Sequence, residues 1–406
     1  MKRIVVIMAA LALTPAAGRA QVAVHGDIVH TMDGAAITDG VVLIVDGKIA
    51  AVGPAGQVTV PEGYPILEAA VVTPGLVDVH TTAGLSGIFN VPHDQDQLER
   101  SAALQPELRA LDAYNPQEEL VGWLRSFGVT TMHTGHSPGA PVSGQTMIVK
   151  TRGQSVAEAV VREAAAVAVT ITGSGGGFDN PLLTTRAKTI ALLRQDLIKA
   201  GEYRAKRARA DKDDDAEAPD RDLHTETMVR VLDGELALMV TAHRVRDIMG
   251  ALRLADEFGL RLWLDGAAEA HQILPAIREA GVPVLLHPTM MRAFGETENA
   301  SMETASLLRD AGIPFAIQSG YEAYVPKTRV ILFEAGVAAS HGLGFDGALA
   351  AITLEAAKIL GIDDRVGSLA AGKDGDVALY DGDPFEYTTH CLGTIIEGAV
   401  VSEVRR

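Results

Sequence analysis

Residues 71–87 read VVTPGLVDVHTTAGLSG and form the most informative stretch of the chain. An apolar run there carries a single aspartate, Asp78, ends at His80, and is followed by glycine and serine. Such a run is typical of a strand in a parallel sheet, because helices cover both faces of that kind of sheet and bury the strand. Parallel strands deliver their last side chains to the open end of a barrel or sheet, where α/β proteins place their chemistry. We therefore expect a functional site close to His80.

The middle of the chain contains about eight apolar runs bounded by turn or helix signals. They lie at residues 72–80, 128–133, 145–151, 167–172, 236–243, 260–265, 282–287 and 313–319. Helical patterns separate most of them, including amphipathic stretches at 247–258 and 346–360 and an alanine-rich stretch that follows a capping box at 155–158. A (β/α)8 barrel requires eight strands that alternate with helices. The fold class predicted for this region is therefore α/β, a TIM barrel.

Both ends of the chain show short strands and tight turns instead. Asp46-Gly47 separates two apolar runs near the N-terminus, and Glu397-Gly398 does the same near the C-terminus. Asp-Gly between apolar runs is a strong hairpin signal. Neither end alone has enough strands for a stable sheet. We expect one composite β-sandwich from residues 21–72 plus 366–406, with the barrel at 73–365.

Residues 1–20 have the layout of a cleaved secretory signal. Lys2 and Arg3 precede an apolar core at 4–13, and Gly18 and Ala20 supply a small-residue end. The alternative, a buried N-terminal strand, does not explain this order of charged start, apolar middle and small end. We expect a mature N-terminus at Gln21 and a periplasmic or secreted protein.

Composition limits the classes of partner. The formal net charge of −17 argues against non-specific binding to nucleic acid or to an anionic membrane surface. After residue 20 no apolar run is long enough for a membrane span. Cys391 is the only cysteine, so the chain has no partner for an intrachain disulfide. A small-molecule substrate or ligand is the partner that we expect.

One segment has a strongly charged composition. Residues 206–222 read KRARADKDDDAEAPDRD and contain no large apolar side chain, so they have nothing to bury. We interpret the segment as a solvated helix extension or loop between the fourth and fifth barrel strands. A partner-binding role is the alternative.

The stretch 73–80, TPGLVDVH, resembles the first barrel strand of the amidohydrolase superfamily, and of its secreted imidazolonepropionase-like members in particular. That strand reads roughly PGLIDxHxH, and its two histidines bind a catalytic metal. Residues 367–386, GSLAAGKDGDVALYDGDPFE, resemble the tail in which the family's chain leaves the barrel and rejoins the small domain. The resemblance implies hydrolysis of a non-peptide carbon–nitrogen bond, such as that of a cyclic amide, with one or two divalent metal ions, typically zinc. A catalytic metal needs about three protein ligands and one open position for water.

The family's ligand pattern matches this chain only in part. His80 stands at the first position of the strand-one pair, but Thr82 stands at the second. His243 is retained in TAHR, where relatives read HAHR; Gly266 stands in LDGA, where they read LEHA; and Gly320 stands in IQSG, where they read IxSD. The candidate metal ligands are therefore His80 and His243 alone. Two neutral imidazoles would hold at most one weakly bound ion, and no catalytic residue is assigned.

Two further residues can enter this ligand set under stated conditions. The fourth run lacks the family's lysine or glutamate, and Lys150, on the third run, takes that role only if the strand count is one too low. Asp265 can replace a lost carboxylate only through a bulge, because neighbours along a strand point to opposite faces.

Other polar groups near the predicted mouth leave alternatives open. His133 and His136 follow the second strand, His93 lies in the loop after the first, and His287 ends the seventh. Each of these is an ordinary loop or cap histidine in the simpler interpretation. The glycine-rich residues 173–177 either present N–H groups to an anion or form a turn.

Three functional hypotheses follow from these residues. The first is a metal-dependent hydrolase of carbon–nitrogen bonds. The second is a catalytically inactive, metal-free paralogue that binds a small molecule in the periplasm. The third is a hydrolase with a rearranged site that uses His133 or His136.

Overall fold

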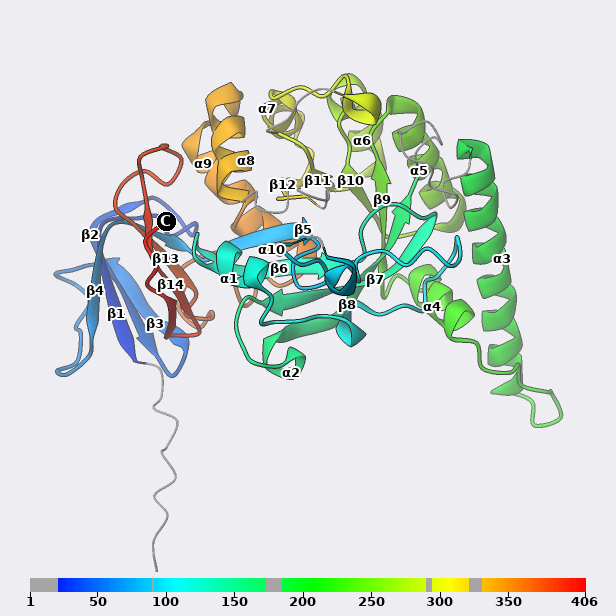
Figure 1. The fold of residues 1–406 in the computed structure, drawn as a ribbon, viewed down its shortest axis with the longest axis horizontal. Coiled ribbons are helices and arrows are strands. Elements are labelled where there is room, and N and C mark those ends of the chain that lie inside the picture. The colour runs from blue at the N-terminus through cyan, green and yellow to red at the C-terminus, as the bar shows by residue number, and fades with distance from the viewer. Residues whose placement is uncertain (1–20, 90, 172–184, 290–293, 321–330) are drawn as a thin grey trace, which may run out of the picture.

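The computed structural model describes residues 21–89, 91–171, 185–289, 294–320 and 331–406. Two sheets organise these residues: a seven-stranded sheet built from both ends of the chain, and an eight-stranded sheet from the middle. Figure 1 shows the smaller sheet beside the larger one, with the C-terminus in the smaller sheet. The predicted leader, residues 1–20, lies outside the described residues.

The seven-stranded sheet joins the two termini in one hydrogen-bonded layer. Its order is β15-β14-β13-β4-β1-β2-β3, and the antiparallel pair of β13 with β4 connects the C-terminal strands to the N-terminal ones. Both predicted hairpins are present, as the pairs β2–β3 and β14–β15. Their turns form readily because Asp46, Gly47, Glu397 and Gly398 all have the positive φ that a tight two-residue turn needs. The strands are β1 (Val22–Val29), β2 (Ile37–Val45), β3 (Lys48–Pro54), β4 (Ile66–Pro74), β13 (Val377–Tyr380), β14 (Cys391–Ile396) and β15 (Ala399–Ser402).

The eight-stranded sheet confirms the predicted strand positions, since each of the eight runs contains or overlaps one strand. These are β5 (Leu76–Thr81), β6 (Val129–Gly135), β7 (Val142–Lys150), β8 (Val160–Thr170), β9 (Ala237–Ala242), β10 (Leu262–Gly266), β11 (Val284–Leu286) and β12 (Phe315–Ile317). The strands neighbour one another in chain order, and a parallel bridge between Thr81 and Gly320 brings the last back to the first. The sheet is thus a nearly closed barrel.

The direction of β7 departs from the all-parallel expectation. This strand is antiparallel to both β6 and β8, whereas the other neighbouring pairs are parallel. Only residues 136–141 connect β6 to β7, and a parallel pair needs a crossover of a dozen or more residues. The short connection forces the chain to turn back.

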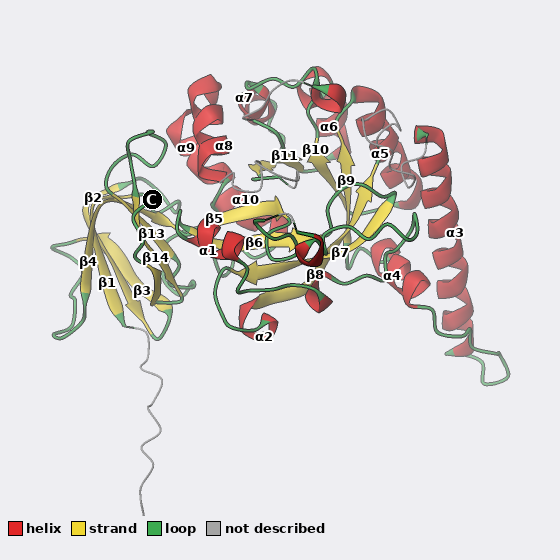
Figure 2. Cartoon of the chain, viewed as in Figure 1, coloured by secondary structure: helices red, strands yellow, loops and turns green. Residues whose placement is uncertain are grey.

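Helices surround the second half of the barrel (Figure 2). The predicted helix at 247–258 is confirmed as α5, which ends at Gly259 in the left-handed conformation. The predicted helix at 346–360 is two helices, α9 and α10, separated at Thr353. The described helices are α1 (Glu119–Arg125), α2 (Val156–Ala159), α3 (Arg186–Ala210), α4 (Leu223–Leu232), α5 (Val245–Phe258), α6 (Leu274–Ala280), α7 (Thr304–Asp310), α8 (Ile331–Ala338), α9 (Gly344–Ala351) and α10 (Leu354–Leu360).

The helix predicted after the capping box at 155–158 is wrong. Only the single turn α2 forms there, and the chain continues directly into the long strand β8. The reason is tertiary, because β8 pairs with both β7 and β9 and this pairing overrides the helix propensity of its alanines. The charged residues 206–222 are mostly exposed and extend from the end of α3 to α4, as expected.

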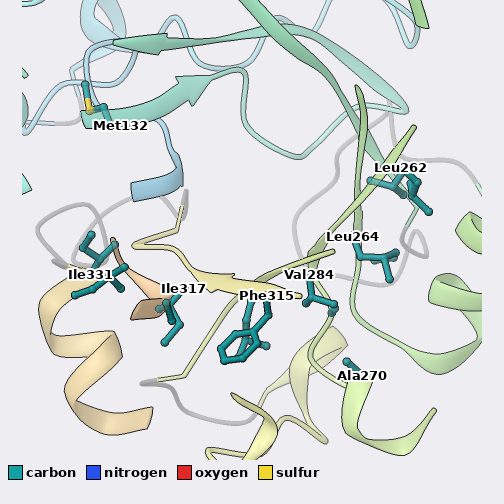
Figure 3. Close-up of a cluster of buried hydrophobic side chains, with 14 of the residues drawn as sticks. Met132, Leu262, Leu264, Ala270, Val284, Phe315, Ile317 and Ile331 are labelled. Atoms are coloured by element: carbon teal, nitrogen blue, oxygen red, sulfur yellow. The ribbon is translucent and has the colours of Figure 1, made fainter. Parts of the chain in front are cut away.

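Two apolar clusters hold the barrel together. Figure 3 shows part of the outer one, in which Leu262, Leu264, Val284, Phe315 and Ile317 from adjacent strands face the surrounding helices. The inner cluster fills the barrel with residues from alternate strand positions and is closed by α10; it includes Val77, Val79, Ile148, Ala168, Met239, Trp263, Leu285, Ala316 and Leu360. No helix in the described part of the chain combines the length and the apolar character needed to cross a membrane.

Candidate functional site

A buried histidine–carboxylate pair lies at the carboxyl end of the barrel strands. The Nδ1 atom of His80 is 2.7 Å from Oδ1 of Asp265, and neither side chain is exposed. Thr241 donates to Oδ2 of Asp265 over 2.6 Å, and Gln318 donates to Oδ1 over 2.7 Å. A carboxylate can only accept hydrogen bonds, so the proton between the pair belongs to Nδ1 of His80. The pair thereby fixes the tautomer and the orientation of the imidazole.

The two buried carboxyl groups that bond to His80, those of Asp78 and Asp265, have opposite pKa shifts. Burial opposes ionisation of Asp265, but the charge and hydrogen bond of His80, with the bonds from Thr241 and Gln318, outweigh it and lower the pKa to about 2. Burial dominates at Asp78 and raises its pKa to about 6, although Ser319 and the N–H of His80 donate to its carboxylate. Asp265 is therefore ionised at neutral pH, whereas Asp78 takes up a proton as the pH falls toward 6.

A bulge turns His80 into the barrel. Asp78 pairs with Met132 and Thr81 pairs with Thr134, so β5 uses one residue more than β6 over the same length. The prediction that Asp265 needs a bulge is wrong, because β10 keeps regular register and places Asp265 on the inner face with Trp263. The irregularity that brings the pair together lies in β5.

His243 follows β9 and fills the space beside β10. Gly266 has a φ of +78°, and a Cβ atom added there would lie 2.5 Å from Cε1 of His243, far closer than real Cβ atoms approach. The imidazole of His243 therefore takes the room that a side chain at 266 would need. The two predicted ligands do come to one end of the barrel, His80 against Asp265 and His243 against its neighbour Gly266.

The remaining family positions hold no metal donors of the expected kind. The hydroxyl of Thr82 lies 2.9 Å from that of Ser86 and serves a local turn. Gly320 has a positive φ and donates its N–H to the carbonyl of His80, which helps to close the barrel. Across the described ranges, no three His, Cys, Asp or Glu side chains gather in an arrangement that could hold a metal ion. The residues at positions 82 and 320 therefore do not fit the ligand set of the family's two-metal centre.

Lys150 is excluded from the site by the direction of β7. It pairs with Thr131, near the start of β6, so it lies at the opposite end of the barrel from His80. Its ammonium is buried and bonds to Asp376 and, over 3.0 Å, to Asp374. The hypothesis of a carboxylated Lys150 is therefore wrong, and the residue links the barrel to the smaller sheet.

His133 has a structural role. Its Nδ1 donates to the carbonyl of Val79 over 2.7 Å, and Thr146 lies 2.6 Å from its Nε2. Burial and the neighbouring His80 lower the pKa of His133 to about 3, so the imidazole is neutral at pH 7. Both ring nitrogens are engaged, which argues against its use in a rearranged site.

The remaining histidines that the sequence suggested for the site differ in exposure. His93 is exposed in a short turn after β5, His287 is buried at the end of β11, and His136 is buried just beyond β6. The glycine-rich residues 173–177 lie outside the described residues.

Sequence reasoning missed the polar residues that support the pair. Thr241, Gln318 and Ser319 were not singled out, and Asp78 was noted without a role. Each stands at or near the end of a predicted strand, and this position is the signal that identifies them.

Comparisons with known proteins agree with the fold. A model of a family described as "Amidohydrolase family" matches residues 319–402. The amidohydrolase tasK of Hapsidospora irregularis is 24% identical over 374 residues, which are 85% of this chain and 37% of that protein. The imidazolonepropionase of Shewanella oneidensis is 29% identical over 161 residues, 39% of this chain and 34% of that protein. The crystal structure of an amidohydrolase from Thermotoga maritima superposes with a TM-score of 0.86 at 28% identity, over 95% of this chain and all of that one.

The extent of these matches differs. The chain spans just over a third of the length of the curated relatives that it matches, whereas it covers the Thermotoga maritima chain completely.

Proposed function

The chain belongs to the amidohydrolase superfamily, and we propose on that basis that it hydrolyses a non-peptide carbon–nitrogen bond in a small molecule, such as a cyclic amide. The observation that carries the proposal is the buried His80–Asp265 pair at the carboxyl end of the barrel strands. The imidazolonepropionase among the relatives supports a cyclic amide as the substrate class.

The pair supplies a general base. Because Nδ1 of His80 carries the proton shared with Asp265, Nε2 is the basic nitrogen. In the proposed step Nε2 takes a proton from water, the water oxygen bonds to the carbonyl carbon, and the proton passes to the amide nitrogen as the carbon–nitrogen bond breaks. The products are a carboxylic acid and an amine. Asp265, ionised throughout, stabilises the imidazolium that forms.

The test is turnover of a panel of lactams, hydantoins and acylated amines by the purified protein and by three variants. His80→Gln and Asp265→Asn should each reduce kcat/KM by about 100-fold or more, the usual range for loss of a general base. His93→Gln, at an exposed histidine, is the matched control and should be unchanged. Equal turnover by His80→Gln and the parent protein would refute this role.

The resemblance implies zinc, and we propose that the chain holds at most one weakly bound divalent ion. The two-metal centre needs side-chain ligands at positions 82, 266 and 320. Gly266 and Gly320 have no side chain to supply, and the hydroxyl of Thr82 bonds to Ser86. Elemental analysis after dialysis against a mild chelator, with His80→Ala and His243→Ala alongside, measures the metal content. Two equivalents of tightly held zinc that both substitutions remove would contradict the proposal.

A second candidate is a metal-free small-molecule binding protein. The contact of His243 with Gly266 favours it, because the imidazole occupies the place of a ligand side chain in relatives. Under this alternative, amides raise the thermal unfolding temperature but yield no product. Product formation that survives chelation and depends on His80 would decide for the hydrolase.

Further parts of the proposal concern architecture and location. We infer that residues 73–365 are a variant of the (β/α)8 TIM barrel in which β7 runs antiparallel to its neighbours, and that 21–72 plus 366–406 form the composite β-sandwich domain. We also propose that residues 1–20 are a signal peptide and that the mature protein is periplasmic or secreted. Intact-mass measurement of the exported form should give an N-terminus at Gln21, and a mass that retains residues 1–20 would count against export by this route.

A further inference from the structure

His136 is a buried polar side chain that has no hydrogen-bond partner among the described residues. The residue is 4% exposed, and neither Nδ1 nor Nε2 makes a hydrogen bond that joins it to another described residue. The backbone of Gln97 lies close enough to favour the protonated ring, but no contact between them meets the geometry of a hydrogen bond. A buried donor and acceptor left unpaired cost stability, and native proteins retain them where they serve a purpose.

The position of His136 assigns it to the mouth of the barrel. Thr134 of β6 pairs with Thr81 of β5, and His136 lies two residues further toward the carboxyl ends of these strands. The imidazole lies against Gly144 of β7, where an added Cβ would be 2.4 Å from Cδ2 of His136. A side chain at 144 would therefore displace the ring, and glycine leaves the room that it occupies.

The electrostatic state of His136 restricts the group that it can bind. Burial lowers the pKa of His136 to about 4, so the ring is neutral at pH 7 and offers one N–H donor and one nitrogen acceptor. A carboxylate ligand would favour the imidazolium, which burial disfavours. An uncharged amide offers both an N–H and a carbonyl, which match the two functions of the neutral ring.

We propose that His136 binds the uncharged amide group of the ligand at the barrel mouth and thereby selects neutral cyclic amides. This inference rests on the proposed function, because it assumes that the mouth receives a small amide. His133, three residues earlier, lacks this capacity because both of its nitrogens are engaged.

Thermal unfolding tests the inference without any measurement of turnover. His136→Leu removes the unpaired polar group and should raise the unfolding temperature of the free protein by about 2 °C. His93→Leu, at an exposed histidine, is the matched control and should leave it unchanged. A stabilising substitution is the outcome that separates a binding residue from a structural one, because loss of a structural histidine destabilises.

The second arm adds the probe 2-pyrrolidinone. The probe should raise the unfolding temperature of the parent protein and of His93→Leu, leave that of His136→Leu unchanged, and raise that of His136→Gln, which keeps a donor and an acceptor, by a smaller amount. The inference is overturned if both His136 variants unfold at lower temperature than the parent, or if the probe shifts the parent and His136→Leu equally. Binding without hydrolysis would preserve the inference and reject only the proposed function.

Discussion

Replacing Gly266 with alanine should destabilise the protein because the imidazole of His243 occupies the space beside it. The φ of +78° costs an alanine about 1 kcal/mol. The added methyl group would also lie 2.5 Å from Cε1 of His243, an overlap of the kind that costs about 1–3 kcal/mol in a packed interior. The expected loss in the free energy of unfolding is therefore about 2–4 kcal/mol.

A matched substitution separates the two contributions. Gly234 also has a positive φ, +71°, but an added Cβ there meets nothing within 4 Å. Gly234→Ala should therefore cost only the backbone part, about 1 kcal/mol. Denaturant unfolding of both variants measures the difference, which is the cost of the contact with His243.

A double-mutant cycle identifies His243 as the cause. In the His243→Ala background the ring is absent, so Gly266→Ala should cost about 1 kcal/mol, and the coupling energy should be about 1–3 kcal/mol. An equal cost in both backgrounds would refute the reasoning, and so would a loss below about 0.5 kcal/mol in the parent. The result bears on function, because a histidine restored at 266 would have to displace His243.

Three further predictions concern other parts of the chain. Lys150→Met leaves the buried carboxylate of Asp376 without its cation, whereas Asp374 keeps Lys48 and Arg365, and the substitution should cost about 3–5 kcal/mol in denaturant unfolding, against about 0–1 kcal/mol for the half-exposed Lys48→Met; similar losses in the two variants would contradict this. The hydrogen bond to Asp196 raises the pKa of His224, so its stabilisation is complete below the unfolded pKa of about 6.5 and disappears as pH rises through the folded value. The deficit of His224→Gln, about 1 kcal/mol at pH 5.5, should therefore shrink by pH 9, and a pH-independent deficit would disprove the assignment. Burial raises the pKa of the Cys391 thiol to about 11, so iodoacetamide should label it only in denaturant, and rapid labelling of the native protein would refute its burial.

The local pattern of apolar runs and turn residues in the sequence was sufficient to predict where the strands lie. The run that ends at His80 and the seven others were predicted as strands because apolar runs of that length, bounded by turn residues, are typical of buried strands. The hairpins at Asp46-Gly47 and Glu397-Gly398 follow from residues that tolerate positive φ. These features depend on neighbours in the chain, so they can be read without the fold.

The composition of the site depended on contacts between distant residues. His80 and Asp265 are 185 positions apart, and the bulge that turns His80 inward is a matter of pairing between β5 and β6, which periodicity does not encode. The reversal of β7 likewise removed Lys150 from the site, because strand direction follows from how the chain closes the barrel.

The same distinction between sequence and structure applies to the positions at which relatives carry metal ligands. The sequence alone determined that Thr82, Gly266 and Gly320 stand where relatives carry donors, since identity at a position needs no structure. Only the tertiary structure decided that His243 fills the room at 266 and that Asp265 faces His80. The reason is physical: a side chain's chemistry is set by its own atoms, but its partners are set by packing in three dimensions.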